Sequence, residues 1–236
     1  MSRAFRPLVL CYHRVSSSPP HRLAVSAETL GAHLGLLMRR GYVPGRVEDV
    51  LAGRSRVFHV TFDDAFRSVQ NALPVLERAS TPATVFVCSA FADTGTVAIP
   101  SLDDDVARAP GEFATLTWDE LRELDLDVGS HAVSHPYLTR LGDDELRREL
   151  DESRERIEDE LRRPCRWLAY PYGDHDARVR AVAEQAGYRA AFAVAGHRAP
   201  VDPFALPRVD LYFRDVGLGA AFKLSPLFRW GAGARR

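Results

Sequence analysis

The sequence predicts an α/β fold in which about seven strand–helix units form a distorted (β/α)7, TIM-like barrel. Three observations favour this fold. Short apolar runs alternate with helical patterns along the chain, which is typical of repeated βα units around a parallel sheet. The 236 residues suit an undivided α/β barrel, and 46% of them are hydrophobic. Neither a repeat nor a long linker divides the chain, so we expect one domain over residues 1–236.

Each predicted element rests on a local pattern. Apolar runs predict strands at 8–12, 57–62, 83–88, 126–130, 166–170, 189–194 and 209–213. Apolar residues at helical spacing predict helices at 26–40, 66–79, 117–124, 143–161 and 177–187. Pro74 is expected to kink the second helix, and Thr117 with Glu120 forms a capping box for the third. Residues 91–113 are predicted to be a surface insertion. An open, doubly wound sheet is the alternative, because periodicity does not reveal closure.

Composition limits the classes of partner. The formal net charge of −1 gives no attraction of the whole chain to nucleic acid. Cys11, Cys88 and Cys165 lie far apart in or beside apolar runs and are interpreted as reduced core thiols. The N-terminus lacks the apolar stretch of a signal peptide, and no window has the roughly 20 apolar residues of a membrane span, so a cytoplasmic protein is expected. Phe222 to Trp230 resembles an amphipathic tail that could contact a membrane, although docking onto the barrel is the favoured interpretation.

Two carboxylates follow the strand predicted at 57–62. If the strand ends there, Asp63 and Asp64 can both turn into one pocket at the carboxyl end of a barrel, where catalytic groups gather. Two confined carboxylates are unfavourable unless a cation neutralises one of them, so the pair indicates a metal site. The alternative is a pair that caps the next helix.

Two further polar clusters follow later strands. His131 and His135 lie four residues apart, a spacing that lets two imidazoles reach one ion in a helical turn. A coincidental surface pair is the alternative. Tyr172 stands between Pro171 and Gly173 in a tight turn, which could present a backbone N–H to an oxyanion. Judged alone, the pattern favours the alternative, an ordinary strand-to-helix turn.

Taken in this order, the clusters resemble the motifs of the polysaccharide deacetylases, the carbohydrate esterases that contain the NodB homology domain. The family's T-F-D-D-G is similar to residues 61–65, with Ala65 in place of glycine. Its H-[ST]-x-x-H is similar to residues 131–135, with Ala132 at the hydroxyl position, and its R-x-P-Y-G to residues 169–173, with Ala169 replacing arginine. The likeness runs from about Val9 to Asp210 and is greatest to the bacterial poly-N-acetylglucosamine deacetylase branch.

The resemblance implies a site and a reaction. Asp64, His131 and His135 would ligate one divalent metal ion, most often zinc in this family, with cobalt, nickel or manganese as substitutes. Asp63 would act as the general base for a water molecule, and the Tyr172 backbone N–H would stabilise the oxyanion. The implied substrate is an acetylated amino sugar, and the products are acetate and a free amine.

Two parts of the family's site are missing, and the sequence offers replacements. Ala169 occupies the place of the arginine that orients the base, and Arg208 is a candidate to supply the guanidinium, although a structural or surface role is equally open. The family's late histidine, which protonates the leaving amine, has no counterpart after Val201, and His13 is the candidate acid, with a buried structural histidine as the alternative. These departures keep two other hypotheses open: a catalytically silent carbohydrate-binding relative and a metal-dependent hydrolase of a non-sugar amide. The sequence does not indicate an oligomeric state.

Overall fold

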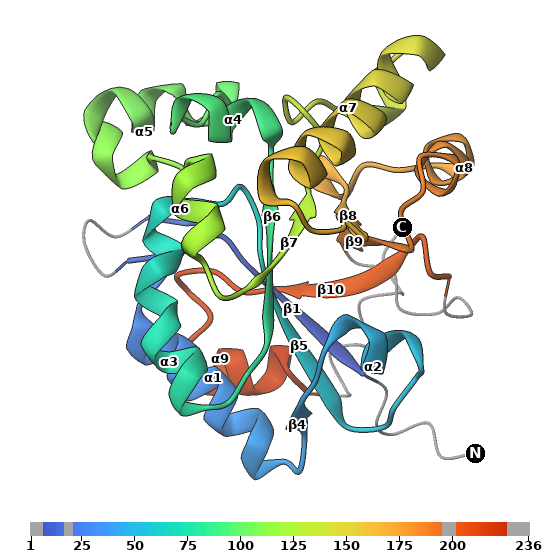
Figure 1. Cartoon of the computed structure of the whole chain (residues 1–236). Helices are drawn as coiled ribbons and strands as arrows, with labels where there is room; N and C mark the ends of the chain where they lie inside the picture. Colours follow the sequence, from blue (N-terminus) through green and yellow to red (C-terminus); the bar gives the residue numbers. More distant parts are fainter. Residues whose placement is uncertain (1–6, 17–20, 195–201, 226–236) are drawn as a thin grey trace.

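A closed barrel of parallel strands forms the centre of the molecule (Figure 1). The computed structural model describes residues 7–16, 21–194 and 202–225. Within these residues the barrel strands are β1 (Leu8–Tyr12), β5 (Val57–Phe62), β6 (Ala83–Val87), β7 (Asp127–Ser130), β8 (Trp167–Ala169), β9 (Ala190–Val194) and β10 (Leu206–Asp210). The first strand pairs with both β5 and β10, which closes the sheet. The predicted (β/α)7 barrel is confirmed, and the open-sheet alternative is wrong.

Helices cover the outside of the barrel (Figure 1). They are α1 (Ala27–Arg39), α2 (Val47–Leu51), α3 (Leu73–Arg78), α6 (Trp118–Glu123), α7 (Asp143–Leu161), α8 (Ala177–Gln185) and α9 (Gly217–Lys223). The hydroxyl of Ser26 accepts from the Thr29 amide at the start of α1, and the capping box of Thr117 and Glu120 begins α6 as expected. The helix predicted at 66–79 is divided into a 3-10 helix, η1 (Arg67–Ala72), and α3, because Pro74 occupies the first turn of α3.

The insertion is more ordered than its composition predicts. It contains α4 (Ser89–Thr94), η2 (Pro100–Leu102), α5 (Asp103–Arg108) and η3 (Pro110–Phe113). Phe91, Ile99 and Phe113 pack with Phe66 in a small apolar cluster of their own. The predicted surface insertion is therefore not an irregular loop: Gly and Pro separate several short helices that share a small core.

Some short elements escape sequence analysis. They are β2 (Arg14–Val15), β3 (Ala24–Val25), β4 (Val43–Pro44), η4 (Leu138–Arg140), η5 (Pro171–Gly173) and the helices α2 and α9. The last barrel strand is also displaced, because β10 begins at Leu206 and ends at Asp210, whereas a strand was predicted at 209–213. Pro207 and Arg208 interrupt the apolar pattern there, and Arg208 nevertheless points into the barrel.

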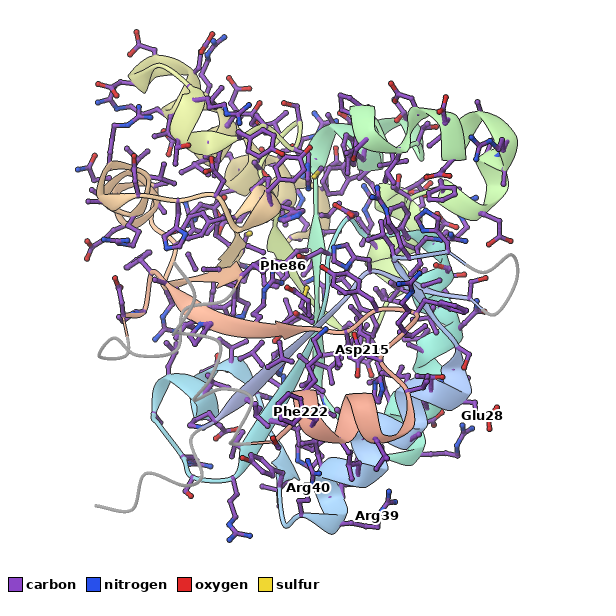
Figure 2. All side chains as sticks on the ribbon, turned by 180° about the vertical axis from the view of Figure 1, so that it is seen from behind. Glu28, Arg39, Arg40, Phe86, Asp215 and Phe222 are labelled. Atoms are coloured by element: carbon purple, nitrogen blue, oxygen red, sulfur yellow. The ribbon has the colours of Figure 1, made fainter. Side chains whose placement is uncertain are left out.

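Strand side chains fill the barrel and pack beneath the helices. Phe86 lies inside, with its ring centroid 5.4 Å from that of Phe192, while Glu28 and Arg39 project outward from α1 (Figure 2). Gly129 on β7 has no room for a side chain, because a Cβ there would come within 2.8 Å of the Trp167 carbonyl oxygen. Since all barrel pairings are parallel, the loops after the strands gather at one end. That end holds the predicted polar clusters.

The C-terminal helix docks onto the first helix. The Arg40 guanidinium donates to the Ala221 carbonyl oxygen at 3.0 Å, and this contact joins α9 to the end of α1 (Figure 2). Of the predicted tail from Phe222 to Trp230, residues 222–225 are described and 226–230 lie outside the described residues. In the described ranges, none of the helices combines the length and the apolar character needed to cross a bilayer.

Candidate active site

The chain leaves β5 through a sharp turn that brings both adjacent carboxylates inside. The Asp63 amide still donates to the Tyr12 carbonyl oxygen at 2.9 Å, extending the ladder with β1. Asp64 and Ala65 then adopt left-handed conformations, with φ of +63° and +47°. Both carboxylates are only 3% exposed. The strand therefore ends where the metal-site interpretation requires it, and Ala65 holds a conformation that a glycine adopts at lower cost.

Arg208 reaches Asp63 from β10. Its Nη1 and Nη2 donate to Oδ1 and Oδ2 at 2.6 and 2.7 Å, and its side chain is 0% exposed. Burial opposes ionisation of Asp63, but Arg208 and then His131 outweigh burial and hold the pKa of this carboxyl well below its usual range. The same carboxylate raises the pKa of Arg208 despite the desolvation of the guanidinium. Arg208 thus lies in the interior, in a paired geometry that fixes the orientation of Asp63.

Asp64 faces the two histidines. Its Oδ1 lies 3.4 Å from His135 Nε2 and 3.7 Å from His131 Nε2. One potential ligand atom from each of the three residues lies within 4.8 Å of the others. Within the described residues Oδ1 has no hydrogen-bond partner although it is buried. A buried carboxylate oxygen without a donor is costly, and a cation between the three groups would satisfy it.

Protonation states also suit a cation. The Nδ1–H of His131 donates to the Ala169 carbonyl oxygen at 2.7 Å, which leaves Nε2 as the free lone pair. Burial lowers the pKa of His131 to about 4 and that of His135 to about 2, so both imidazoles are neutral. Burial, and then Asp63, raise the pKa of Asp64 to about 8. The Asp64 carboxyl group therefore keeps its proton at neutral pH and would lose it when a cation binds. Two neutral imidazoles and the resulting carboxylate are a donor set that binds zinc, and the residues present fit a divalent metal.

Helix α7 anchors the loop that carries the two histidines. Glu149 accepts hydrogen bonds from the Val133 and Ser134 amides at 2.8 and 3.0 Å and from the Ser134 hydroxyl at 2.6 Å. One turn further along α7, Ser153 donates to the Ala132 carbonyl oxygen at 3.0 Å. These contacts fix a loop in which Ala132 and His135 have φ of +65° and +62°.

Sequence analysis missed this support. The charged residues at 143–161 predict a helix with a solvent-exposed charged face. Nothing in their spacing links Glu149 to the histidine loop. One signal was present: Ser153 shares the helical spacing of the buried Leu146, Leu150 and Ile157. A serine on an apolar helix face has to find a polar partner, and that partner is the loop.

The turn at Tyr172 lies beside His135. Tyr172 has a left-handed φ of +58°, and its ring centroid is 4.4 Å from that of His135. A Cβ at Gly173 would lie 2.7 Å from the Val194 amide nitrogen, so the turn packs closely against β9. Tyr137 stacks on Tyr172 with centroids 4.0 Å apart, and the Arg140 guanidinium lies 4.1 Å from the Tyr137 centroid. Both contacts are made by the ring faces of Tyr137, so its ring edges remain open for other contacts.

His13 follows β1 and lies close to Asp63 and Cys11. Its ring is stacked on Tyr212 with centroids 5.9 Å apart. Burial lowers the pKa of His13, while Asp63 acts in the opposite direction. Three other histidines have separate partners: His33 contacts the Tyr12 hydroxyl, His59 contacts Thr84, and His175 stacks on Tyr170. His197 lies outside the described residues.

Comparison with known proteins agrees with this geometry. A sequence model of the family described as polysaccharide deacetylase matches residues 52–191, more than half of the chain and the part that carries all three motifs. The chain belongs to the polysaccharide deacetylase family. No curated protein gives a significant match to this deacetylase.

Solved structures share its fold. IcaB from Ammonifex degensii is 26% identical, with a TM-score of 0.74 over 98% of each chain. A Streptococcus pyogenes deacetylase, PplD, solved in complex with acetate, is 20% identical, with a TM-score of 0.76 over 94% of this chain and all of its own. A polysaccharide deacetylase from Bacillus cereus is 21% identical, with a TM-score of 0.72 over 94% of this chain and 70% of its own. For the last two proteins, whose sequence identity is low, the similarity concerns the fold alone.

The deacetylase lacks the arginine of the family's third motif, but another residue brings a guanidinium to Asp63. Ala169 stands at the motif position on β8, where its carbonyl oxygen accepts from His131. Arg208 on the strand after β9 brings its guanidinium to Asp63 instead. Side chains at these positions of β8 and β10 point into the barrel interior. A long side chain from either strand can therefore reach the Asp63 carboxylate.

Proposed function

We propose that this deacetylase removes N-acetyl groups from an N-acetylglucosamine-containing glycan or glycoconjugate, releasing acetate. Family membership supports the carbohydrate deacetylase class. The observation that carries the finer proposal is the convergence of Asp64, His131 and His135 beside a carboxylate, Asp63, that is held by Arg208. A cation-binding triad next to an oriented general base is the arrangement that hydrolysis of an unactivated amide requires.

Asp64, His131 and His135 would hold one divalent ion, for which zinc is our first candidate. When bound, such an ion supplies Lewis acidity to a water molecule and to the acetyl carbonyl group. Three protein ligands leave coordination positions open, as in other hydrolytic sites. The His131 Nδ1–H bond to the Ala169 carbonyl oxygen supports this assignment, because it directs Nε2 at the site.

Asp63 would take a proton from the attacking water. Its low pKa keeps it ionised at neutral pH, and Arg208 holds both of its oxygens in place. A carboxyl group with so low a pKa does not retain the proton. We therefore expect the proton to pass on, directly or through His13, to the amine nitrogen as the C–N bond breaks.

Tyr172 and His13 complete the proposed site. The Tyr172 backbone lies in a left-handed turn beside His135, and its N–H would donate to the oxyanion of the tetrahedral intermediate. His13 is the proposed acid, because it lies close to Asp63, from which it can receive the proton. Its lowered pKa makes it neutral at rest, so it would relay a proton received during the reaction.

Metal analysis and an acetate-release assay test the proposal together. We expect one equivalent of zinc or cobalt per chain, and acetate release from N-acetylglucosamine oligomers that chelation abolishes and added metal restores. Asp64→Asn should lower the metal content, whereas Asn71→Asp, a change of one charge outside the site, should not. Metal binding without acetate release from any N- or O-acetylated sugar would indicate the silent carbohydrate-binding relative. Release from acetylated peptides alone would indicate a non-sugar amide hydrolase.

A further inference from the structure

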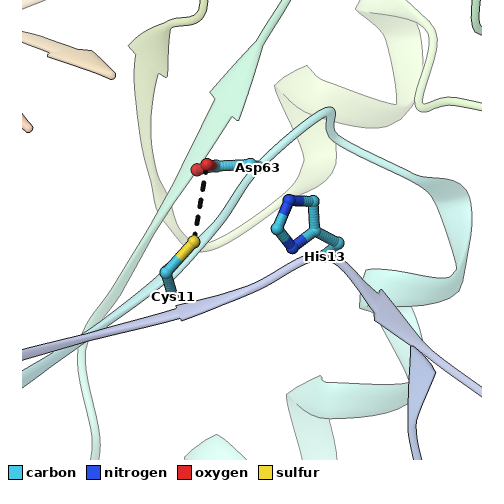
Figure 3. Close-up of side chains that lie close together, drawn as sticks. All are labelled: Cys11, His13 and Asp63. Carbon is cyan, nitrogen blue, oxygen red and sulfur yellow. Dashed lines mark hydrogen bonds between the residues drawn. The ribbon is translucent and has the colours of Figure 1, made fainter. Parts of the chain in front are cut away.

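A second set of potential metal-binding groups includes Asp63 itself. Cys11, at the end of β1, His13, two residues later, and Asp63 each direct a ligand atom into one space (Figure 3). We propose that these three residues form a second cation site, specific for soft divalent ions such as zinc, and that its occupancy switches the deacetylase off. Binding at this site stands on its own geometry, and only the inhibition rests on the proposed function.

The distances suit zinc with little movement. Sγ of Cys11 lies 3.4 Å from Asp63 Oδ2. Tetrahedral zinc with bonds of about 2.3 Å to sulfur and about 2.0 Å to oxygen separates these two ligands by about 3.5 Å. The three ligand atoms lie within 4.8 Å of one another. An approach of the His13 imidazole by about 1 Å would therefore complete a coordination triangle, with the fourth position left for solvent.

Unused polar atoms mark the site. Nδ1 of His13 is buried and has no hydrogen-bond partner within the described residues. The same holds for Oδ1 of Asp210, the neighbour of Cys11 across the β1–β10 pairing. Oδ2 of Asp63 accepts from Arg208 and from the Cys11 thiol, so a cation can take over the lone pair that the thiol now uses. Atoms without partners in a buried place are where a ligand gains most.

The Asp63 carboxylate is paired with the Arg208 guanidinium, and Asp210 lies beside Cys11 across the β1–β10 pairing. Loss of the thiol proton adds a second negative charge next to Asp63, which offsets the repulsion between a cation and the guanidinium. Burial raises the pKa of the Cys11 thiol, so the free protein keeps the proton on sulfur. On binding, the S–H bond breaks, an S–metal bond forms and one proton leaves to solvent, with no change of oxidation state. A thiolate and an imidazole select zinc, cobalt or cadmium over magnesium and calcium.

Occupancy of this site would remove the general base. A cation bound to Asp63 Oδ2 withdraws the electron pair with which this carboxylate accepts the proton from water. The two proposed sites are neighbours, since His131 Nε2 lies 4.0 Å from the same oxygen. We therefore expect activity to rise with the first equivalent of zinc and to fall at least tenfold with an excess, while excess magnesium has no such effect.

Cobalt titration followed by absorption spectroscopy tests the site without reference to activity. Asp64, His131 and His135 contain no sulfur, so the first equivalent should give only weak d–d bands. The second should add an intense thiolate-to-cobalt charge-transfer band. Cys11→Ser should abolish this band, and Cys165→Ser, at an equally buried thiol that contacts Trp167, should keep it. Absence of the band in the wild-type protein, or its persistence in Cys11→Ser, would overturn the proposal.

Two further measurements separate this inference from the proposed function. If Cys11→Ser does not fold, His13→Ala should also lose the band, and an unchanged band in that variant would count against the site. A charge-transfer band without inhibition by excess zinc would support the second site but refute its proposed inhibition of the deacetylase. A band that forms with the first equivalent would instead contradict Asp64, His131 and His135 as the tighter site, which is a failure of the proposed function.

Discussion

Replacement of Glu149 tests whether α7 positions the metal-binding loop. Glu149→Ala removes three hydrogen bonds to residues 133 and 134, two of them to backbone amides between the proposed metal ligands His131 and His135. Hydrogen bonds to a charged group contribute about 1.5–3 kcal/mol each, but Glu149 is half-buried and Ser153 still holds the start of the loop. We therefore expect a loss of about 2 kcal/mol in metal binding, roughly 30-fold in the dissociation constant.

Competition with a chromophoric chelator measures this constant directly. Glu149→Gln keeps the shape of the side chain and one carbonyl oxygen for the two amides, so it should recover most of the affinity. Glu152→Ala removes the same charge from the exposed side of the same helix and should bind metal like the wild-type protein. Equal dissociation constants for Glu149→Ala and Glu152→Ala would refute a positioning role for Glu149.

Two other substitutions test the energetics of the site, and one alkylation reaction tests burial in the core. Arg208→Ala should lower the free energy of unfolding by about 3–5 kcal/mol in urea denaturation, because it leaves the Asp63 carboxylate buried and unpaired. The double variant Arg208→Ala, Asp63→Asn should recover part of this loss. Additive effects of the two substitutions on the unfolding free energy would argue against the pair. Ala65→Gly should raise the unfolding free energy by up to about 1 kcal/mol, since φ is +47° at this position, and a lower melting temperature would contradict the strain. Burial raises the pKa of Cys165 to about 12, so this thiol should resist iodoacetamide at pH 8 until the protein is unfolded, as followed by mass spectrometry; alkylation of the folded protein at the rate of a free thiol would refute that burial.

Local patterns predicted the barrel strands and the longest helices. The strand at Leu8–Tyr12 and the helix at Asp143–Leu161 have the predicted bounds, because apolar spacing and capping residues act within a few residues of the chain. The sequence left a closed barrel and an open sheet as alternatives, since closure depends on pairing of β1 with β5 and β10, which are far apart in the chain. Hydrophobic periodicity carries no signal for such pairing.

The candidate site also contains residues that local patterns predict and residues that only tertiary contacts reveal. Asp63, Asp64, His131 and His135 stand directly after predicted strands, so parallel strands bring them to one end of the barrel. Glu149 could not be found, because it acts across a loop–helix contact that leaves no pattern in a charged helix. The contribution of Cys11 was missed as well, because a cysteine in an apolar strand is interpreted as a core residue. Only the register of β1 beside β5 places its thiol against Asp63.

Asp63 offers the most direct test of the central claim. Wild-type protein and Asp63→Asn, each reconstituted with one equivalent of zinc and verified by elemental analysis, should be compared for acetate release from N-acetylglucosamine oligomers. The account predicts equal metal content, with acetate release reduced at least roughly 100-fold in Asp63→Asn because the general base is lost. Acetate release at the wild-type rate from a metal-loaded, folded Asp63→Asn protein would contradict it.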